Sequence, residues 1–409
     1  MKIDILHYSA PPVVGGVESV IAHHARLMTA SGHSVRLLAG RGESSDRRIP
    51  VIDIPLADSR HPRILEAKRQ LDQGRLPEDF AALTGELTSQ LEEITNQTDI
   101  LIAHNVCSLH KNLAITTALH RLSGKSTSLL TILWHHDLAW TTPRYRSELH
   151  DGYPWDLLRQ DWPFATQVVV SELRRQELSD LINVPASRVA VIPNGLDIRK
   201  FFKLEARTTD FIQQLNLLSA APLLLLPVRI TPRKNIELAL QIMSALRPTM
   251  PAARLVITGP MGPHNPANIH YFNRLKKLRD ELYLQEAVHF LAEITPEYLP
   301  DEVISDFYRL ADGLILPSRE EGFGIPVLEA GISGLPVFCS NIPPLQSIAG
   351  DNAVYFQPDS NPEQVAELIN NHLSTDKVFQ LRIETRTRYT WEKIYQDQIE
   401  PLLRSPQVT

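Results

Sequence analysis

Short apolar runs alternate with helical patterns along almost the whole chain, and this alternation constrains the fold more than any other feature. The runs are rich in leucine and in β-branched residues, and most are followed by a segment with helical periodicity. Such alternation predicts parallel sheets with helices on both faces, an α/β architecture. We expect strands at residues 3–8, 35–39, 51–55, 100–104, 128–134, 167–170, 189–192, 223–228, 254–258, 288–291, 313–316, 336–339 and 354–356.

The strands fall into two series that meet at an Asn194-Gly195 turn, which predicts two Rossmann-like, doubly wound domains. At 409 residues the chain is long enough for each domain to bury its own core. We expect an N-terminal domain over residues 1–195 and a C-terminal domain over 196–388. The last segment, 389–409, is expected to form a helix that packs back toward the N-terminal domain.

Composition excludes several classes of protein. The net charge is only −6, so binding to nucleic acid is not expected. The two cysteines, Cys107 and Cys339, lie far apart and match no metal or disulfide spacing, which favours a reducing, cytoplasmic location. The longest apolar run, residues 220–228, is far shorter than the ~20 residues that span a bilayer. Peripheral contact with the cytoplasmic face of a membrane stays open, and so does the oligomeric state.

Two glutamates eight positions apart give the strongest functional signal. Glu321 precedes a helix that Gly324 and Pro326 are expected to open, and Glu329 falls about one turn inside that helix. The spacing alone is common by chance, and an acidic residue in a first turn often only complements the helix dipole. Here, however, the backbone amides between the glutamates are free to bind an anion, and they belong to Gly322, Phe323, Gly324 and Ile325. The carboxylates could accept hydrogen bonds from sugar hydroxyls, and the amides could donate to phosphate oxygens. The arrangement therefore suits a sugar joined to a diphosphate.

Arg229 and Lys234 lie in a loop that runs into a helix starting near Asn235. Two cations at such a place can hold a diphosphate and stabilise the charge that grows as it leaves. A solvated basic loop is the alternative. The sequence contains no D-x-D triplet, no H-E-x-x-H motif and no paired-cysteine motif, so no metal and no other cofactor is expected.

In the first half, polar motifs again follow predicted strands. Gly15 and Gly16 form a turn where backbone amides could approach a phosphate or a sugar, or simply a tight turn, and they do not fit the dinucleotide fingerprint. His136 and Asp137 follow the strand that ends at Trp134, and could serve a sugar hydroxyl or satisfy each other. Whether His135 or His136 faces the ligand stays open. His104-Asn105 is expected to make structural hydrogen bonds, and Ser171 to cap a helix.

The stretch from Leu316 to Val337 resembles the signature of the family 4 retaining glycosyltransferases, and the resemblance extends over about residues 2 to 400. It is carried by Pro317-Ser318, Glu321-Gly322-Phe323-Gly324, Pro326, Leu328-Glu329-Ala330 and Gly334-Leu335-Pro336-Val337. The resemblance implies the GT-B architecture, in which two Rossmann-like domains face each other across a cleft. It also implies a metal-independent hexosyltransferase that moves a sugar, with retention, from a nucleotide-diphosphate sugar, UDP- or GDP-linked, to the hydroxyl of a carbohydrate or lipid-linked acceptor in glycan, polysaccharide or glycolipid synthesis.

The same resemblance implies roles for individual residues. Glu329 would hold the ribose hydroxyls, Glu321 would lie by the donor sugar, and Arg229 with Lys234 would grip the diphosphate. The amides near Phe323 and Gly324 would contact sugar or phosphate, and the backbone near Ile294 the base. In the N-terminal domain the roles fall on Gly15 and Gly16, which would approach the donor, and on His136 and Asp137.

Two other classes of protein stay open. A glycosyl phosphorylase or a nucleotide-sugar epimerase could use the same two-domain fold. A noncatalytic protein that binds sugar nucleotides would show donor binding without hydrolysis or transfer.

Overall fold

The computed structural model describes residues 1–12, 15–44, 46–125, 129–260, 267–295 and 297–405. Ser128, the expected first residue of one strand, and residues 406–409 of the expected last segment lie outside the described residues. The chain forms two compact units. Unit 1 combines Met1–Gly195 with the chain from Trp391 onward, and unit 2 is Leu196–Thr390.

Unit 1 is built on a seven-stranded parallel sheet in the order β3-β2-β1-β4-β5-β6-β7. The central strand β1 pairs with a neighbour on each side, so that Ile3 lies opposite both Val35 and Ile100. Because β-branched and leucine side chains alternate to both faces, the sheet is apolar above and below. The strands are β1 (Lys2–Leu6), β2 (Ser34–Ala39), β3 (Val51–Asp53), β4 (Ile100–His104), β5 (Leu130–His135), β6 (Ala165–Val169) and β7 (Val189–Val191).

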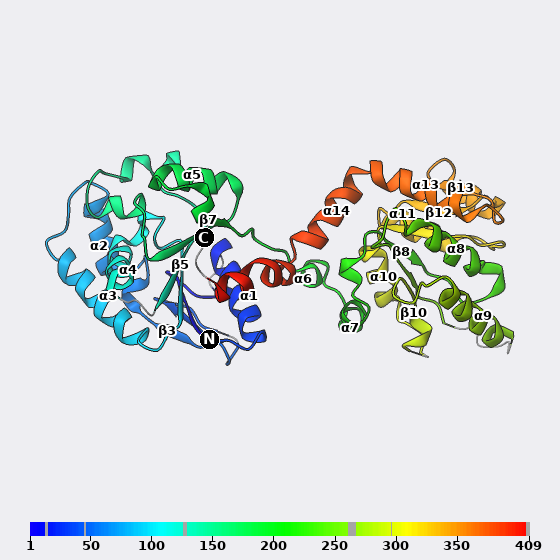
Figure 1. The fold of residues 1–409 in the computed structure, drawn as a ribbon, viewed down its shortest axis with the longest axis horizontal. Helices are drawn as coiled ribbons and strands as arrows, with labels where there is room; N and C mark the ends of the chain where they lie inside the picture. Colours follow the sequence, from blue (N-terminus) through cyan, green and yellow to red (C-terminus); the bar gives the residue numbers. More distant parts are fainter. Residues whose placement is uncertain (13–14, 45, 126–128, 261–266, 296, 406–409) are drawn as a thin grey trace. The chain divides into compact units, whose positions relative to one another are not determined.

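Helices cover both faces of this sheet, as Figure 1 shows. One core contains the inner sides of α2 (Pro62–Leu71), α3 (Phe80–Ile94) and α4 (Leu113–Lys125). The other core contains α1 (Gly16–Ala30) and the last helical segment of the chain. That segment consists of α15 (Trp391–Ile394), a π-helical turn (Tyr395–Ile399) and α16 (Glu400–Arg404). Helix α5 (Glu172–Ile182) packs near β6 and β7.

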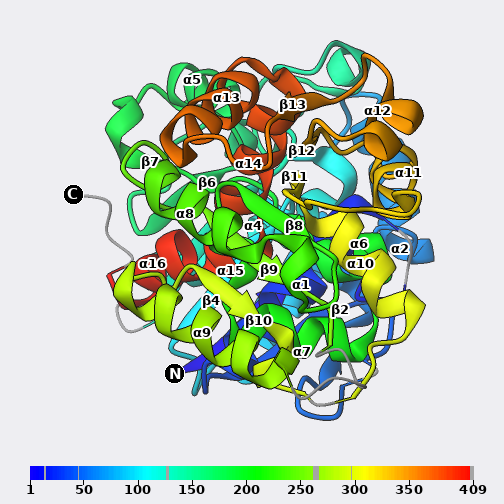
Figure 2. The same ribbon diagram turned by 90° about the vertical axis from the view of Figure 1, so that its right-hand side faces the viewer.

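Unit 2 repeats the plan with six parallel strands in the order β10-β9-β8-β11-β12-β13. Figure 2 shows β10, β9 and β8 following one another. The strands are β8 (Leu223–Leu226), β9 (Arg254–Ile257), β10 (Val288–Phe290), β11 (Gly313–Leu316), β12 (Val337–Ser340) and β13 (Val354–Phe356). The helices are α6 (Ile198–Phe202), α7 (Ala206–Gln214), α8 (Ile236–Leu246), α9 (Ala267–Glu281), α10 (Asp301–Leu310), α11 (Ile325–Ile332), α12 (Pro343–Ala349), α13 (Pro362–Thr375) and α14 (Lys377–Arg388).

In each sheet the strand order reverses at one point, which lies between the neighbouring strands β1 and β4 in unit 1 and between β8 and β11 in unit 2. This order confirms two Rossmann-like, doubly wound domains, the units of the GT-B architecture, and every expected strand is present to within two residues. Ligands of such sheets bind beyond the carboxyl ends of the strands at the reversal point. Among the described residues, no helix has the length and apolar character needed to cross a bilayer.

Candidate active site

Two loops of unit 2 meet at the reversal point of its sheet. One follows β8 and the other follows β11, and these strands are hydrogen-bonded neighbours. The amide of Arg319 donates to the carbonyl of Arg233 over 2.8 Å. Asn235 adds a second link, because its side-chain nitrogen donates to the carbonyl of Pro317 at 3.0 Å and to that of Pro358 at 2.9 Å. The two loops are therefore fixed to each other before any ligand binds.

Lys234 and Glu321 form an ion pair across these loops. Lys234 Nζ lies 2.5 Å from Glu321 Oε1, and the side chains are only 9% and 7% exposed. The hydroxyl of Ser318 donates to the same oxygen over 2.6 Å. Glu321 Oε1 is thus occupied by two donors, which leaves Oε2 as the oxygen available to a ligand. A pair this well shielded also holds each side chain in place, since freeing either one would leave a buried charge.

Arg229 and Glu329 line one cavity of about 250 Å³. Its other walls are residues 227–228 after β8, residues 258–260 after β9, the start of α10 with the segment before it, and the start of α11. The hydroxyl of Tyr308 donates to Glu329 Oε2 over 2.5 Å. Burial, and then the neighbouring carboxylate, raise the pKa of Tyr308 far above its usual range, so the phenol stays a donor. Lys234, Glu321 and Ile294 are not among the described residues that line this cavity.

The turn before α11 presents unused backbone amides. The helix begins at Ile325 with a proline in its first turn, as the sequence predicts. Gly324 has φ +107°, and a Cβ there would lie 2.7 Å from a methyl group of Leu345, so this position favours glycine in conformation and in space. Within the described part of unit 2, the amides of Gly322, Phe323, Gly324 and Ile325 donate to no acceptor. They remain available to an anion at the helix N-terminus.

In unit 1, the side chain of Glu18 partly fills the space beside the turn that leads from β1 into α1. A Cβ on Gly15 would lie 2.1 Å from Glu18 Oε2, whereas a Cβ on Gly16 would meet nothing within 4 Å. Glu18 is held there because the hydroxyl of Ser9 donates to its Oε1 over 2.7 Å. A side chain at position 15 would therefore displace the carboxylate of Glu18, whereas the space over Gly16 is open.

The structure distinguishes the two adjacent histidines at the end of β5. His135 is buried, and its Nε2 lies 2.7 Å from the side-chain oxygen of Gln167. His136 is half-buried, and its Nε2 lies 3.1 Å from Nδ1 of His104. Burial lowers the pKa of His135 to about 4 and that of His136 to about 3. Both imidazoles are neutral at neutral pH, and His136 is the one just beyond the carboxyl end of β5.

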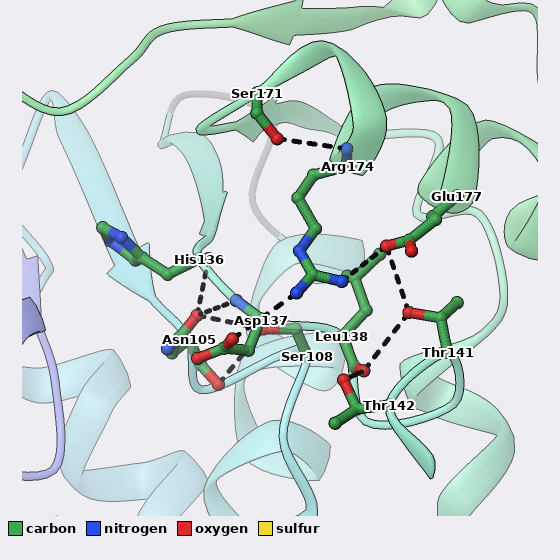
Figure 3. A network of polar contacts seen from close by, with 10 residues as sticks. All are labelled: Asn105, Ser108, His136, Asp137, Leu138, Thr141, Thr142, Ser171, Arg174 and Glu177. Carbon is green, nitrogen blue, oxygen red and sulfur yellow. Dashed lines mark hydrogen bonds and ion pairs between the residues drawn. The ribbon is translucent and has the colours of Figure 1, made fainter.

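Figure 3 shows the polar network around Asp137. The side-chain oxygen of Asn105 accepts from the amides of His136 and Asp137, at 2.7 and 3.3 Å. The carboxylate of Asp137 faces Arg174, with 3.7 Å between Oδ1 and the nearer guanidinium nitrogen, and Arg174 pairs more closely, at 2.5 Å, with Glu177. Ser171 caps α5 by accepting from the amide of Arg174, which confirms the predicted cap.

One group in the described residues has the composition of a metal site. Asp72, His110 and Glu148 bring ligand atoms within 4.8 Å of one another. The ammonium group of Lys68 donates to Asp72 at 2.6 Å and to Glu148 at 2.8 Å. A cation of the protein itself thus already offsets part of the negative charge of this group. Metal independence stays a prediction.

Sequence reasoning assigned no role to three residues that support the site in unit 2. Tyr308 and Ser318 each donate to one of the two glutamates, and Asn235 joins the two loops. Ser318 belongs to the family signature, and Asn235 carries a signal of its own, because asparagine tolerates the left-handed conformation, φ 52°, that the end of this loop adopts. Nothing in the local sequence could show that Tyr308, in another helix, reaches Glu329.

Two family models match the chain. The model described as Glycosyltransferase Family 4 matches residues 14–200, and the model described as Glycosyl transferases group 1 matches residues 208–389. Together they account for about nine tenths of the sequence and divide it between the two units. The chain belongs to the family 4 glycosyltransferases.

Curated relatives of this glycosyltransferase are similar over most of its length. A mannosylglucosylglycerate synthase of Petrotoga mobilis is 25% identical over 366 residues, which cover 84% of this chain and 83% of that protein. A D-inositol 3-phosphate glycosyltransferase of Corynebacterium urealyticum is 25% identical over 350 residues, which cover 81% of this chain and 77% of that protein. These relatives agree with the family in naming a sugar-transferring enzyme.

A sucrose-phosphate synthase from Thermosynechococcus elongatus is similar in structure, with a TM-score of 0.40 and 17% identity over 99% of this chain and 98% of that one. An Anabaena protein in complex with UDP and glucose has a TM-score of 0.37 and 18% identity over 98% of this chain and 99% of that one. Both values are low. The fold of this glycosyltransferase rests on its own strand order.

Proposed function

We propose that this glycosyltransferase moves a hexosyl group from a nucleotide-diphosphate sugar to an acceptor hydroxyl, with retention at the anomeric carbon and without a metal ion. The observation that carries the proposal is the arrangement at the reversal point of unit 2. There Arg229 and Glu329 line one cavity, and the buried Lys234–Glu321 pair joins the loops that follow β8 and β11.

The chemistry of each group supports this division of roles. Glu329, oriented by Tyr308, is a carboxylate acceptor suited to the paired hydroxyls of a ribose. Arg229 is exposed and can reach a diphosphate, for which a guanidinium offers paired donors. The unused amides of residues 322–325 add donors for phosphate or sugar oxygens.

Glu321 is assigned to the donor sugar rather than to covalent catalysis. Its Oε1 already accepts hydrogen bonds from Lys234 and Ser318, which engage the lone pairs that a nucleophile would use. An anion stabilised in this way is a weak nucleophile, but its Oε2 can still accept a hydrogen bond from a sugar hydroxyl. Lys234, held close by, then balances the charge that develops on the departing diphosphate.

The relatives and the geometry point to a hexosyl donor and a hydroxylated acceptor. The printed names of the relatives include mannosylglucosylglycerate synthase and O-antigen chain mannosyltransferase, so UDP-glucose and GDP-mannose are the first donors to test. In unit 1, His136 and Asp137 offer a neutral imidazole and a carboxylate, which suit hydroxyl groups. We assign the acceptor to this unit.

The test is donor turnover by the purified chain in excess chelator, followed as release of UDP or GDP, with a panel of sugars and polyols as acceptors. We expect release from one of the two donors, and a product whose anomeric configuration, read by proton NMR, matches that of the donor. Turnover that requires inorganic phosphate would identify a phosphorylase instead. Release that depends on added metal, or inversion of configuration, would contradict the proposal.

A further inference from the structure

Two consecutive residues at the end of β4 hold two consecutive residues at the end of β5. Asn105 holds the main chain of the second pair, because its Oδ1 accepts from the amides of both His136 and Asp137. His104 holds the ring of His136, with 3.1 Å between His104 Nδ1 and His136 Nε2. Figure 3 shows Asn105 lying beneath the start of the loop that carries Asp137. We call these four residues the histidine clamp.

Asn105 is itself fixed in place. It is 3% exposed and adopts a left-handed conformation, φ 58°. Its amide donates to the carbonyl of Trp134 at 2.9 Å, and its own carbonyl accepts from the amide of Leu109 at 3.2 Å and the hydroxyl of Tyr8 at 3.3 Å. Because the main chain of Asn105 is anchored at this many points, its side chain transmits the position of β4 to the loop after β5.

The His104 ring is equally constrained. It is fully buried and stacks on Trp134, with ring centroids 5.3 Å apart and 24° between the planes. Burial, and then the neighbouring histidines, lower the pKa of His104 well below its usual value, so this ring is neutral like that of His136. Two neutral imidazoles at this distance share one N–H between the facing nitrogens. The Nε2 of His136 is therefore committed, and Nδ1 is its remaining ring nitrogen.

We propose that His104 and Asn105 are positioning residues of the transfer reaction, which present Nδ1 of His136 and the carboxylate of Asp137 to the hydroxyl of a neutral polyol acceptor. This inference rests on the proposed function. The clamp acts through His136 and Asp137 and needs no contact of its own with a substrate. It explains why buried polar residues stand at the end of β4, where apolar side chains would pack more simply.

Four variants separate the hydrogen bonds from the packing. Asn105→Gly removes the acceptor but tolerates the left-handed backbone, whereas Asn105→Asp keeps both. His104→Phe keeps an aromatic ring on Trp134 without the nitrogen, whereas His104→Asn returns an amide near the position of Nδ1. Asn183→Gly is the matched control, because Asn183 is also left-handed, φ 55°, but lies exposed at the end of α5.

The first measurement is amide hydrogen exchange by NMR or mass spectrometry on the full chain. We expect exchange at His136 and Asp137 to become about tenfold faster in Asn105→Gly and to stay unchanged in Asn105→Asp and Asn183→Gly. Exchange in Asn105→Gly that equals that of the wild type would overturn the clamp. This measurement needs no substrate, so its result does not depend on the proposed function.

The second measurement separates positioning from folding. The ligand for this measurement is whichever of UDP, GDP and ADP the wild type binds. We expect Asn105→Gly and His104→Phe to bind it as tightly as the wild type does. Their kcat for transfer should be about tenfold to a hundredfold lower, with recovery in Asn105→Asp and His104→Asn. Faster exchange with unchanged transfer would make the clamp purely structural and overturn the role. Failure of the wild type to bind any of the nucleotides would instead refute the proposed function, and with it that role.

Discussion

The candidate sites of the two units differ in whether their central contacts are charged or neutral. In unit 2 the central contacts are charged: Lys234 with Glu321, and Tyr308 with the carboxylate of Glu329. In unit 1 they are largely neutral, since His104 contacts His136 and the amide side chain of Asn105 accepts from main-chain N–H groups. The nearest ion pair, between Asp137 and Arg174, is longer at 3.7 Å and more exposed.

This difference matches the ligand that is proposed for each unit. A diphosphate is an anion whose charge grows during transfer, and fixed cations and dipoles stabilise it best. A hydroxyl group carries no charge, so neutral donors and acceptors can orient it without the cost of burying an ion. The comparison predicts that the two units respond differently to acid, to charge removal and to loss of single hydrogen bonds.

The largest difference between the units should be the loss of stability in acid, which we expect to be greater for unit 1. Burial depresses the pKa of a group of unit 1 histidines: His7, His24, His104, His135 and His136. The folded pKa of His24 is about 3 and its unfolded value about 6.5, so the unfolded state takes up the proton first. The stability is complete above pH 6.5 and is lost as the pH falls toward 3. Between pH 7 and 5, His24 alone should cost unit 1 about 2 kcal/mol.

Tryptophan fluorescence reads this effect, because all five tryptophans lie in unit 1. We expect the urea midpoint of unit 1, followed by fluorescence, to fall as the pH is lowered from 7 to 5. The urea midpoint of unit 2, followed by hydrogen exchange of its peptides, should fall less. His24→Leu should flatten the dependence, since neither ring nitrogen of His24 has a partner among the described residues. Equal shifts in both units would contradict the comparison.

Removal of a single charge should act on unit 2. Lys234→Met leaves Glu321 as an unpaired, nearly buried carboxylate, which should destabilise unit 2 by about 3 kcal/mol and reduce donor turnover. Adding Glu321→Gln removes the stranded charge. We expect the double variant to recover the urea midpoint of unit 2 but not the turnover. Recovery of both would mean that the pair is structural.

Glu329→Gln tests the ribose contact in the same unit. Loss of a charged hydrogen-bond acceptor should weaken nucleoside diphosphate binding about tenfold to a hundredfold in calorimetry. The matching 2′,3′-dideoxy nucleotide should bind the wild type and the variant equally well, because it lacks the hydroxyls. If Glu329→Gln weakened the binding of both nucleotides equally, Glu329 would not contact the ribose hydroxyls.

Tyr308→Phe should have the smallest effect of the series. The phenol orients Glu329 without a proposed contact of its own, so its loss should weaken nucleotide binding about fivefold. In the Glu329→Gln background the same change should add little, since the two residues act as one unit. Additive losses in the calorimetric titrations would show that Tyr308 acts independently of Glu329.

The sequence predicted the framework well because the framework is local. Apolar runs such as that of β11 and the turn before α11 carry their own signals, in Gly313–Leu316 and in Gly324 with Pro326. Every strand was found for this reason. The opening of α11 beside Glu329 followed from the preferences of glycine and proline alone.

What the sequence could not show is how distant side chains meet. The bond from Tyr308 to Glu329 joins two helices, and the contact of His104 with His136 joins two strands. The burial that tells His135 from His136 likewise depends on β4 and β6 lying on either side of β5. Such pairings depend on tertiary structure, so residue patterns along the chain do not encode them individually.

The claim that unit 2 holds a nucleoside diphosphate with protein groups alone is tested most directly by calorimetry in excess chelator. UDP, GDP and ADP are titrated in turn into the full chain. The account predicts that at least one binds, that chelator does not change its Kd, and that Glu329→Gln weakens it while Asn105→Gly does not. Binding of none of the three, or binding only after a divalent metal is restored, would contradict it.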